Sequence, residues 1–395
     1  MILKKCRVCN SEKLTKVFSL GNQPLANNLE DKVTNSKKYP LELNLCKYCS
    51  NCQLTVAINS KKLFHKYLYR SSMSKLFVSH FSKAAEKYIK IFNLNKKSFI
   101  LDVGSNDGIG IIPYKNKKFF NINGIEPALN LSKITNRLGI KTYNSFLNKR
   151  LSNKLNNRYD LITASNVFAH VPKIKEFTNC IREMLKPSGV FIIEVQYLFR
   201  MLKDISFDNI YHEHVNYWSV KSLNYFFTKM NLTIFHVEEI NTHGGSIRVY
   251  VKRSKNKKIK IKNSVEYFLK KEEKFKIQSP ITFKVFSKKV MNKRKKIVKK
   301  ISRLYLKRKT IVGFGAPAKA TTLINFYKLQ KYIQYIIDDN IYKKNKFIPN
   351  TNIKITNKPK NNNIDYILVF AWNYFSEIKK RNKKIAKKFI NIFSP

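Results

Sequence analysis

Short apolar runs that end at Gly or Asp alternate with helix-length segments through the middle of the chain. The runs, each the length of a buried strand, span residues 98–103, 122–125, 159–164 and 190–195. Helix-length segments lie between them, for example 127–138 and 174–185. Strands that alternate with helices form a parallel sheet covered on both faces. The sequence therefore predicts an α/β fold with a doubly wound sheet, which binds ligands beyond the carboxyl ends of its strands.

The pattern changes three times along the 395 residues and divides the chain into four regions. Residues 1–60 are loop-rich and carry five of the six cysteines. Residues 61–250 alternate strands and helices, and residues 309–395 do so again on a smaller scale. Residues 251–308 are dense in Lys, lack Gly and have no strand-sized apolar run. We expect that region to form helices that bridge two domains.

The charge is strongly positive, with 78 Lys and Arg against 24 Asp and Glu, a net charge of +54. Most lysines are dispersed beside Asn or Ile, which argues against a nucleic-acid partner, and only 252–309 is dense in them. Because basic surfaces also bind nucleic acid, an RNA methyltransferase or a basic RNA-binding protein remains the alternative. In either case a positive protein attracts anionic substrates such as nucleotide diphosphates.

No stretch approaches the roughly 20 uninterrupted apolar residues that a membrane helix needs. The first residues, Met-Ile-Leu-Lys-Lys-Cys, have no long apolar run after the lysines. Such a start is not typical of a secretory signal. We therefore expect a cytoplasmic protein with no membrane partner, whose oligomeric state the sequence leaves open.

Two Cys-x2-Cys pairs, Cys6 with Cys9 and Cys46 with Cys49, indicate a metal site. Each pair can form one tight turn that aims two thiolates at a single ion, and two such turns complete a tetrahedral zinc site. A site closed by four sulfurs is structural, because it leaves no position for a substrate. Cys52 leaves open a second pairing, with Cys49 and Cys52 as ligands.

The first apolar run of the middle region continues into a Gly-containing turn that suits a nucleotide. Asp102, Gly104, Asn106 and Gly108 belong to this turn. The two glycines let the backbone bend tightly and approach a ligand. Glu126 ends the next strand, where an acid can accept both ribose hydroxyls. The spacing Asp-x-Gly-x-x-x-Gly, rather than Gly-x-Gly-x-x-Gly, favours S-adenosylmethionine over NAD.

Tyr211, His212, Glu213 and His214 form a second candidate site. One His can act as a general base near neutral pH while Glu213 steadies a neighbouring imidazole. A catalytic metal bound by the His-x-His pair and a polar surface turn are the alternatives.

His243, Gly244, Gly245 and Ser246 lie between two strand-like segments, 233–240 and 247–251. Adjacent glycines expose backbone N–H groups, which can bind an anion or a carbonyl oxygen. A plain hairpin turn explains the same residues equally well.

The C-terminal region has its own strand, glycines and helix in 311–322, with Lys319 at the helix start. Lys319 and the helix N-terminus can hold a phosphate. A further strand, 332–339, ends in two acids. This pattern predicts a small Rossmann-like unit with a nucleotide site and without a Walker loop.

Over nearly its full length the chain resembles the sugar C-methyltransferases that act on nucleotide-linked 4-keto-6-deoxyhexoses, typically dTDP-linked. The features follow one another in the same order as in that family. They are the Cys pairs around 21–27, then 67–74, 102–108, 166–171, 211–214, 243–246 and 313–319.

The resemblance implies four parts with these boundaries: a zinc-binding domain (1–60), a class I methyltransferase domain (61–250), a Lys-rich helical connector (251–308) and a Rossmann-like nucleotide-sugar-binding domain (309–395). The implied reaction is S-adenosylmethionine-dependent methylation at C3 of the sugar, next to the ketone. An NAD-dependent dehydratase or epimerase is the other enzyme class considered, but its Tyr-x-x-x-Lys signature is not evident after the third strand.

The resemblance also implies residue roles. His214 would remove the C3 proton, and Tyr211, Glu213 and Tyr69 would contact the sugar. Asn166 and His170 would lie near the reacting centre, and Lys319 near the nucleotide.

Overall fold

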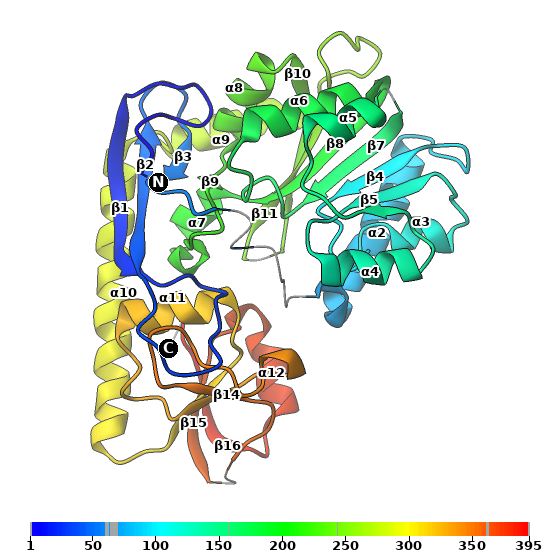
Figure 1. Cartoon of the computed structure of the whole chain (residues 1–395). Helices are drawn as coiled ribbons and strands as arrows, with labels where there is room; N and C mark the ends of the chain where they lie inside the picture. The colour runs from blue at the N-terminus through cyan, green and yellow to red at the C-terminus, as the bar shows by residue number, and fades with distance from the viewer. Residues whose placement is uncertain are drawn as a thin grey trace.

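The computed structural model describes residues 2–59, 63, 70–156, 158–242, 244–360 and 363–393. These residues form three sheets, of four, seven and five strands, in the N-terminal, central and C-terminal parts of the chain (Figure 1). The central and C-terminal sheets carry helices between their strands. The predicted α/β class is therefore confirmed.

The N-terminal sheet is antiparallel and has the strand order β1-β2-β3-β9. Its strands are β1 (Leu14–Gln23), β2 (Tyr39–Cys46), β3 (Cys52–Leu54) and β9 (Asn216–Tyr217). In β2 the leucines at alternate positions 41, 43 and 45 are buried, because successive side chains of a strand face opposite sides. The last strand, β9, comes from the middle of the chain and directly follows the Tyr-His-Glu-His segment. That segment is thus tied to the N-terminal sheet.

The central sheet has the order β10-β11-β8-β7-β4-β5-β6. Its strands are β4 (Ile100–Val103), β5 (Ile122–Ile125), β6 (Thr142–Tyr143), β7 (Tyr159–Ser165), β8 (Leu185–Gln196), β10 (Leu232–Ile240) and β11 (Ser246–Arg253). All neighbouring pairs from β6 to β8 are parallel, while β11 is antiparallel to both β8 and β10. The four predicted strands are confirmed, although β8 begins five residues before the predicted run.

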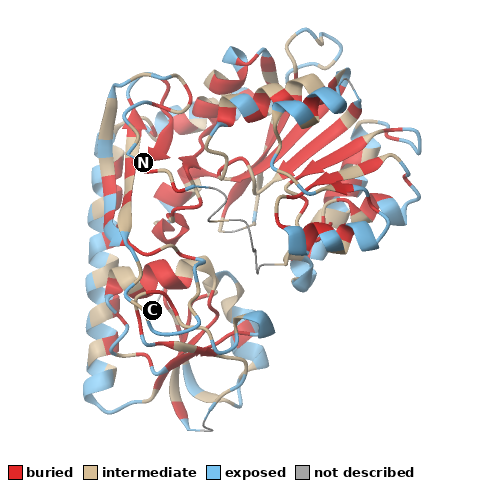
Figure 2. Ribbon diagram, viewed as in Figure 1, coloured by how far each residue is buried: buried red, intermediate tan, exposed pale blue. Residues whose placement is uncertain are grey.

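One helix precedes the first central strand, and others lie between the strands, as the alternation predicted. They are α2 (Lys75–Ile91), α3 (Ile112–Asn116), α4 (Leu129–Arg137), α5 (Lys149–Lys154), α6 (Ile174–Met184), α7 (Leu198–Lys203) and α8 (Val220–Lys229). Figure 2 shows the strands of this sheet buried along their length, whereas the outer faces of the helices are exposed. The core therefore lies between sheet and helices.

The C-terminal sheet is fully parallel, with the order β14-β13-β12-β15-β16. Its strands are β12 (Ile311–Phe314), β13 (Tyr335–Ile337), β14 (Lys354–Thr356), β15 (Ile364–Val369) and β16 (Ala386–Asn391). Helices α11 (Ala318–Tyr327) and α12 (Phe375–Arg381) connect them, together with the short turns η3 (Ile341–Lys343) and η4 (Trp372–Tyr374).

The Lys-dense region forms α9 (Asn263–Lys274) and the long helix α10 (Pro280–Leu306). One stripe of α10 is buried at Phe283, Phe286, Val290, Ile297 and Ile301, a spacing that places all five on one face. The stripe packs on β1, α7 and α11, and the ring of Phe286 lies 5.0 Å from that of Phe18. Helix α10 therefore joins the three parts, as its course along one side of the molecule in Figure 1 shows. Among the helices described, none is long and apolar enough to cross a membrane.

Candidate active site

A cavity of about 860 Å³ opens at the carboxyl ends of the central strands. The strand order reverses between β4 and β7, so the connections that follow these strands diverge and leave a crevice. The cavity is lined by the turn after β4 and extends to Tyr211 and His214. It also reaches Lys319 of the C-terminal part, so more than one part of the chain surrounds the same space.

The turn after β4 has the backbone that the glycines predicted. Gly104 has a φ of +73°, and a Cβ there would lie 2.3 Å from the side chain of Val167. Gly108 has a φ of +90°, and its Cβ would lie 2.6 Å from the side chain of Thr135. Asp102, Gly104 and Asn106 line the cavity, whereas Gly108 lies behind them. Gly108 thus acts by letting the turn pack closely on α4.

Glu126, at the end of β5, ties this turn in place. Its carboxylate accepts hydrogen bonds from the backbone N–H of Asn106 at 2.9 Å and of Ala128 at 2.8 Å. Burial raises the pKa of Glu126, and the two N–H donors oppose that rise. Each carboxylate oxygen retains a further lone pair, so Glu126 can also accept a ribose hydroxyl.

The other residues that line the cavity near the turn after β4 suit a nucleoside. Phe146, Leu147 and Phe177 supply apolar surface beside the turn and Glu126. Buried Asp102 accepts a hydrogen bond from Thr163 at 2.7 Å, and burial raises its pKa to about 7. An acid that can bind ribose, glycines that allow close approach and apolar walls together fit S-adenosylmethionine.

At the other end of the cavity, His214 is held through both ring nitrogens. Its Nδ1 lies 3.0 Å from the carbonyl oxygen of Asn209, and its Nε2 lies 2.7 Å from the hydroxyl of Tyr211. A carbonyl oxygen only accepts, so in the neutral ring Nδ1 carries the proton and Nε2 keeps its lone pair. Tyr211 then donates to Nε2. The arrangement leaves His214 in the tautomer that a base at Nε2 requires.

His170 lies against this pair, with its ring 4.7 Å from that of His214. Its Nδ1 donates to the backbone carbonyl of Glu213 at 3.0 Å. Burial lowers the pKa of His170 to about 4, so this ring is neutral at physiological pH. Asn166, the other residue expected here, also lines the cavity and has a φ of +58°.

Glu213 is buried and faces the N-terminal part of the chain. Its Oε1 accepts a hydrogen bond from the side-chain amide of Asn27 at 2.6 Å. Burial raises the pKa of Glu213 to about 7, and the bond from Asn27 opposes the rise. The residue before Asn27 is bonded in turn to the C-terminal part, since the hydroxyl of Thr321 donates to Ala26 at 2.8 Å. Glu213 is thus fixed where the three parts meet.

Lys319 is buried beside Asp208 and Trp372. Its Nζ lies 3.7 Å from the Asp208 carboxylate and 4.9 Å from the centre of the Trp372 ring. The indole N–H of Trp372 donates to the same carboxylate at 2.6 Å. Burial lowers the pKa of Lys319, and Asp208 opposes this change. The structure therefore places Lys319 at the cavity through contacts with a turn of the central part.

Gly244 and Gly245 lie in a turn that does not line the cavity. Gly244 and Gly245 turn the chain between β10 and β11, and Cβ atoms there would meet Trp372 at 3.0 Å and Arg200 at 2.9 Å. Ser246 is buried and donates to the carbonyl of Thr242. None of these three residues lines the cavity in the part of the chain that the structure describes. His243 and Tyr69 lie outside the described residues.

Asp338, the acid that follows β13, is hydrogen-bonded within the C-terminal part. Asp338 accepts from the backbone N–H of Ala316 at 2.6 Å and of Asn340 at 2.9 Å, and Lys343 lies 3.3 Å away. Ala316 belongs to the glycine turn itself. Asp338 therefore fixes this turn through backbone N–H groups, as Glu126 does for the turn after β4, and Lys343 lies beside its carboxylate.

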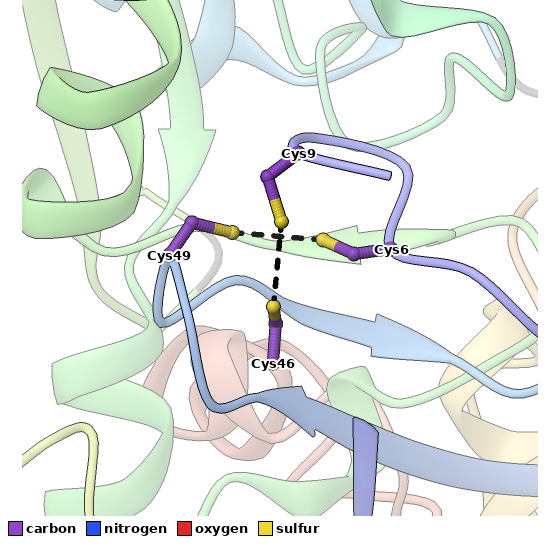
Figure 3. Close-up of side chains that lie close together, drawn as sticks. All are labelled: Cys6, Cys9, Cys46 and Cys49. Atoms are coloured by element: carbon purple, nitrogen blue, oxygen red, sulfur yellow. Dashed lines mark hydrogen bonds between the residues drawn. The ribbon is translucent and has the colours of Figure 1, made fainter. Parts of the chain in front are cut away.

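Four cysteines converge in the N-terminal part (Figure 3). The Sγ atoms of Cys6 and Cys49 are 3.5 Å apart, as are those of Cys9 and Cys46, and all four lie within 4.8 Å of one another. A tetrahedral zinc with Zn–S bonds of about 2.3 Å needs sulfurs about 3.8 Å apart. Cys52 instead pairs with Leu45 in the sheet and lies outside the cluster that these residues form. The geometry favours the Cys46 and Cys49 pair over the shifted one.

Several residues of the site have no counterpart in the sequence prediction. Asn209 supplies the carbonyl that orients His214, and Asn27 supplies the amide that bonds to Glu213. Gln196 lines the cavity, and no described residue lies within hydrogen-bond distance of either amide atom. Its place at the end of a predicted strand is the one signal that points to it, since ligands bind there.

Three family models match successive parts of the chain. Residues 6–64 match a "Putative zinc binding domain", residues 75–237 a "Methyltransferase domain" and residues 241–394 a "C-methyltransferase C-terminal domain". The C-methyltransferase NovU of Streptomyces niveus is 29% identical over 394 residues, which cover 98% of this chain and 93% of that protein.

Solved structures align with part of the chain. An S-adenosylmethionine-dependent methyltransferase from Clostridium acetobutylicum is 15% identical with a TM-score of 0.37, covering 44% of this chain and 91% of its own. The PH0226 protein from Pyrococcus horikoshii is 12% identical with a TM-score of 0.37, covering 49% of this chain and 98% of its own.

Proposed function

Since the chain belongs to the C-methyltransferases that combine a zinc-binding domain, a methyltransferase domain and a C-methyltransferase C-terminal domain, we propose that it methylates a carbon next to a ketone. The substrate of this proposal is a nucleotide-linked 4-keto-deoxysugar, methylated at C3. Likeness to the C-methyltransferase NovU over nearly the full chain supports methyl transfer to a carbon atom. The observation that carries the proposal is that His214 and the turn containing Gly104 line one cavity.

In this proposal His214 is the base. The bond from Nδ1 to the Asn209 carbonyl keeps the lone pair on Nε2, where it faces Tyr211. Once the Tyr211 hydroxyl turns from Nε2 to an oxygen of the bound sugar, the C3 proton passes to Nε2. The C3–H electron pair forms the C3=C4 bond, and the carbonyl π electrons move to the ketone oxygen. A positioned base contributes on the order of 10²–10⁴ in rate.

The neighbours of the base bind and orient the sugar. The hydroxyl of Tyr211 lies 2.7 Å from Nε2 and is therefore within reach of an oxygen on the same ring. Neutral His170 lines the cavity beside this pair and bonds to the backbone carbonyl of Glu213, whose buried carboxyl bonds to Asn27 and would act on the sugar through its neighbours. Tyr69 and His243, which lie outside the described residues, are the candidates for further contacts with the substrate.

The methyl group would come from S-adenosylmethionine, which supplies an electrophilic methyl carbon when bound. Asp102, Gly104, Asn106 and Glu126 would hold it, with Gly108 shaping the turn behind them. The residues that line the cavity exclude water from the carbanion-like carbon, which a proton would otherwise quench.

Zinc has a structural role in this proposal. Cys6, Cys9, Cys46 and Cys49 would close the tetrahedron and fix the loop before β1 and the loop that joins β2 to β3. In the proposed organisation residues 1–60 bind zinc, 61–250 bind the methyl donor and 309–395 contribute to the nucleotide-sugar site, with 251–308 connecting them.

The proposal is tested by incubating the protein with S-adenosylmethionine and a panel of nucleotide-linked 4-keto sugars, with mass spectrometry of the products. We expect the mass of one added methylene group on at least one keto sugar and none on its 4-hydroxy counterpart. Methyl transfer to RNA with no transfer to any keto sugar would overturn it in favour of an RNA methyltransferase.

A further inference from the structure

The ammonium group of Lys319 is buried at the cavity, and no described residue accepts a hydrogen bond from it. No described residue offers one within hydrogen-bond distance of Nζ, because the Asp208 carboxylate lies 3.7 Å away. An ammonium carries three N–H donors, and leaving them unsatisfied in a buried site is costly. A ligand oxygen in the cavity is the partner that these donors lack.

Lys319 and the base are held by neighbouring residues of one short turn. Asp208 and Asn209 both belong to the turn η2 (Phe207–Asn209). Asp208 pairs with Lys319, and the carbonyl of Asn209 accepts the bond from His214. The ammonium is therefore close to the end of the cavity where the proton is removed.

The charged groups at Asp208 have a net charge that one negatively charged ligand group balances. Lys293 of α10 also lies near Asp208, and burial lowers its pKa to about 8 while Asp208 opposes that change. Two ammonium groups and one carboxylate leave a single positive charge. Trp372, whose ring faces Lys319, is neutral. One oxyanion balances the charge of these three groups.

On the basis of the proposed function, we propose that Lys319 is a catalytic residue that donates a hydrogen bond to the C4 oxygen as the enolate forms. When the C3–H bond breaks, the proton goes to His214 and the carbonyl π electrons move to that oxygen. Lys319 stays protonated throughout. A charged donor binds an oxyanion more strongly than a neutral ketone, so the contact lowers the barrier rather than only the KM.

This assignment differs from the one that the family resemblance implies, in which Lys319 lies near the nucleotide. The two roles predict different defects. A group that stabilises the enolate controls proton removal at saturating substrate, whereas a nucleotide anchor controls the affinity for the nucleotide.

The experiment separates proton removal from methyl transfer and from binding. Exchange of the C3 hydrogen of the keto sugar with D₂O is followed by NMR without S-adenosylmethionine, in wild type, Lys319→Met and Lys319→Arg. The Kd of dTDP alone is measured for the same proteins by calorimetry. Lys331→Met, which removes an exposed lysine of the same C-terminal part, is the matched control.

We expect Lys319→Met to slow exchange at saturating sugar on the order of 10²-fold, with the Kd of dTDP changed by less than about twofold. Lys319→Arg should recover part of the rate, and Lys331→Met should match wild type. If Lys319→Met unfolds because Asp208 loses its partner, Asp208→Asn/Lys319→Met removes the pair together and should show the same loss.

Unchanged exchange in Lys319→Met, or a weakened Kd for dTDP with a normal exchange rate at saturation, would overturn this role. A wild-type protein that neither exchanges nor methylates any keto sugar would instead refute the proposed function.

Discussion

The imidazole of His214 depends on a backbone carbonyl for its tautomer. The Asn209 carbonyl accepts the Nδ1 proton, so Nε2 is the atom left to act as a base. A carbonyl serves this purpose whichever side chain its residue carries. We therefore expect substitutions of the Asn209 side chain to disturb the base less than changes that move the turn of residues 207–209.

Gln196 is the residue that we expect to determine affinity for the sugar. Its amide lines the cavity without a described partner, so a sugar hydroxyl can satisfy both donor and acceptor. Gln196→Leu should raise the KM for the sugar roughly 10- to 100-fold, the loss of one or two buried hydrogen bonds, with kcat little changed. Steady-state kinetics check this, with Gln278→Leu, a glutamine outside the cavity, as the control. An unaltered KM in Gln196→Leu would show that its amide does not contact the substrate.

The site residues that could be predicted from the sequence are those whose side chains have a recognisable chemical use. Glu126 and His214 were predicted because an acid after the second strand and a histidine in a polar cluster each have a known use. Asn209 acts through its backbone, and Asn27 is about 190 residues from Glu213 in the chain, so no local pattern indicated either. Gly245 was expected to cradle a ligand but packs on Arg200, because a glycine allows close approach to protein as readily as to ligand.

Among the elements, the segment 211–217 connects the base to the N-terminal sheet. His212, which does not line the cavity, is 1% exposed. Its Nε2 donates to the carbonyl of Pro40 on β2 at 3.3 Å, and its ring contacts Tyr39. The same four residues thus place the proposed base, His214, at the cavity and anchor the segment to the N-terminal sheet through His212.

The anchor makes stability depend on pH. Burial lowers the pKa of His212 to about 4 from its ordinary value of 6.5, so the unfolded state binds more protons between these values. The stabilisation is therefore complete above pH 6.5 and is lost as pH falls towards 4. The free energy of unfolding of wild type, relative to that of His212→Gln, should fall by up to about 2–3 kcal/mol between pH 7.5 and pH 4.5. Denaturant unfolding of both proteins at both pH values measures this, and a constant difference would contradict it.

The two loops that carry Cys6, Cys9, Cys46 and Cys49 are expected to depend on bound zinc. Cys49→Ala should release zinc and lower the unfolding temperature, because it opens a tetrahedral site. Cys52→Ala should keep one zinc per chain, because Cys52 is a buried sheet residue next to the cluster. Metal analysis after gel filtration distinguishes the two variants. Retention of zinc by Cys49→Ala together with its loss from Cys52→Ala would establish the shifted pairing instead.

The elements themselves were largely predictable, and their partners were not. Apolar runs bounded by Gly or Asp became β4, β5, β7 and β8 because fully buried parallel strands need continuous apolar sequence. The two-residue strand β9 has no such signature, since it forms only by pairing with β3. The engagement of Asp338 by the turn at Ala316 likewise depends on tertiary packing.

For the whole molecule, the loop that holds Asn27 connects all three parts. Asn27 bonds to Glu213 of the central part, and Ala26 accepts a bond from Thr321 of the C-terminal part. Helix α10 supports the same arrangement from outside, through its packing on β1 and α11. The N-terminal part is therefore bonded to both other parts beside the cavity, and in the proposed function it helps to position the site.

This connection can be detected in the pH profile. The hydrogen bond from Asn27 lowers the pKa of Glu213, which is about 7. In Asn27→Ala this bond is lost, so the pKa of Glu213 should rise further. The limb of the kcat/KM profile that reports Glu213 should move to higher pH by roughly one unit. Glu213→Gln should abolish that limb. A profile that is unchanged in Asn27→Ala while activity falls would indicate a structural role alone.

The central claim is that His214 removes a proton from the carbon that receives the methyl group. The most direct measurement is the exchange of the C3 hydrogen of the keto sugar with D₂O in His214→Ala, alongside the Kd of S-adenosylmethionine. The account predicts that exchange and methyl transfer both fall, by at least about 10²-fold, while the cofactor binds as in wild type. Exchange at the wild-type rate in His214→Ala would contradict it.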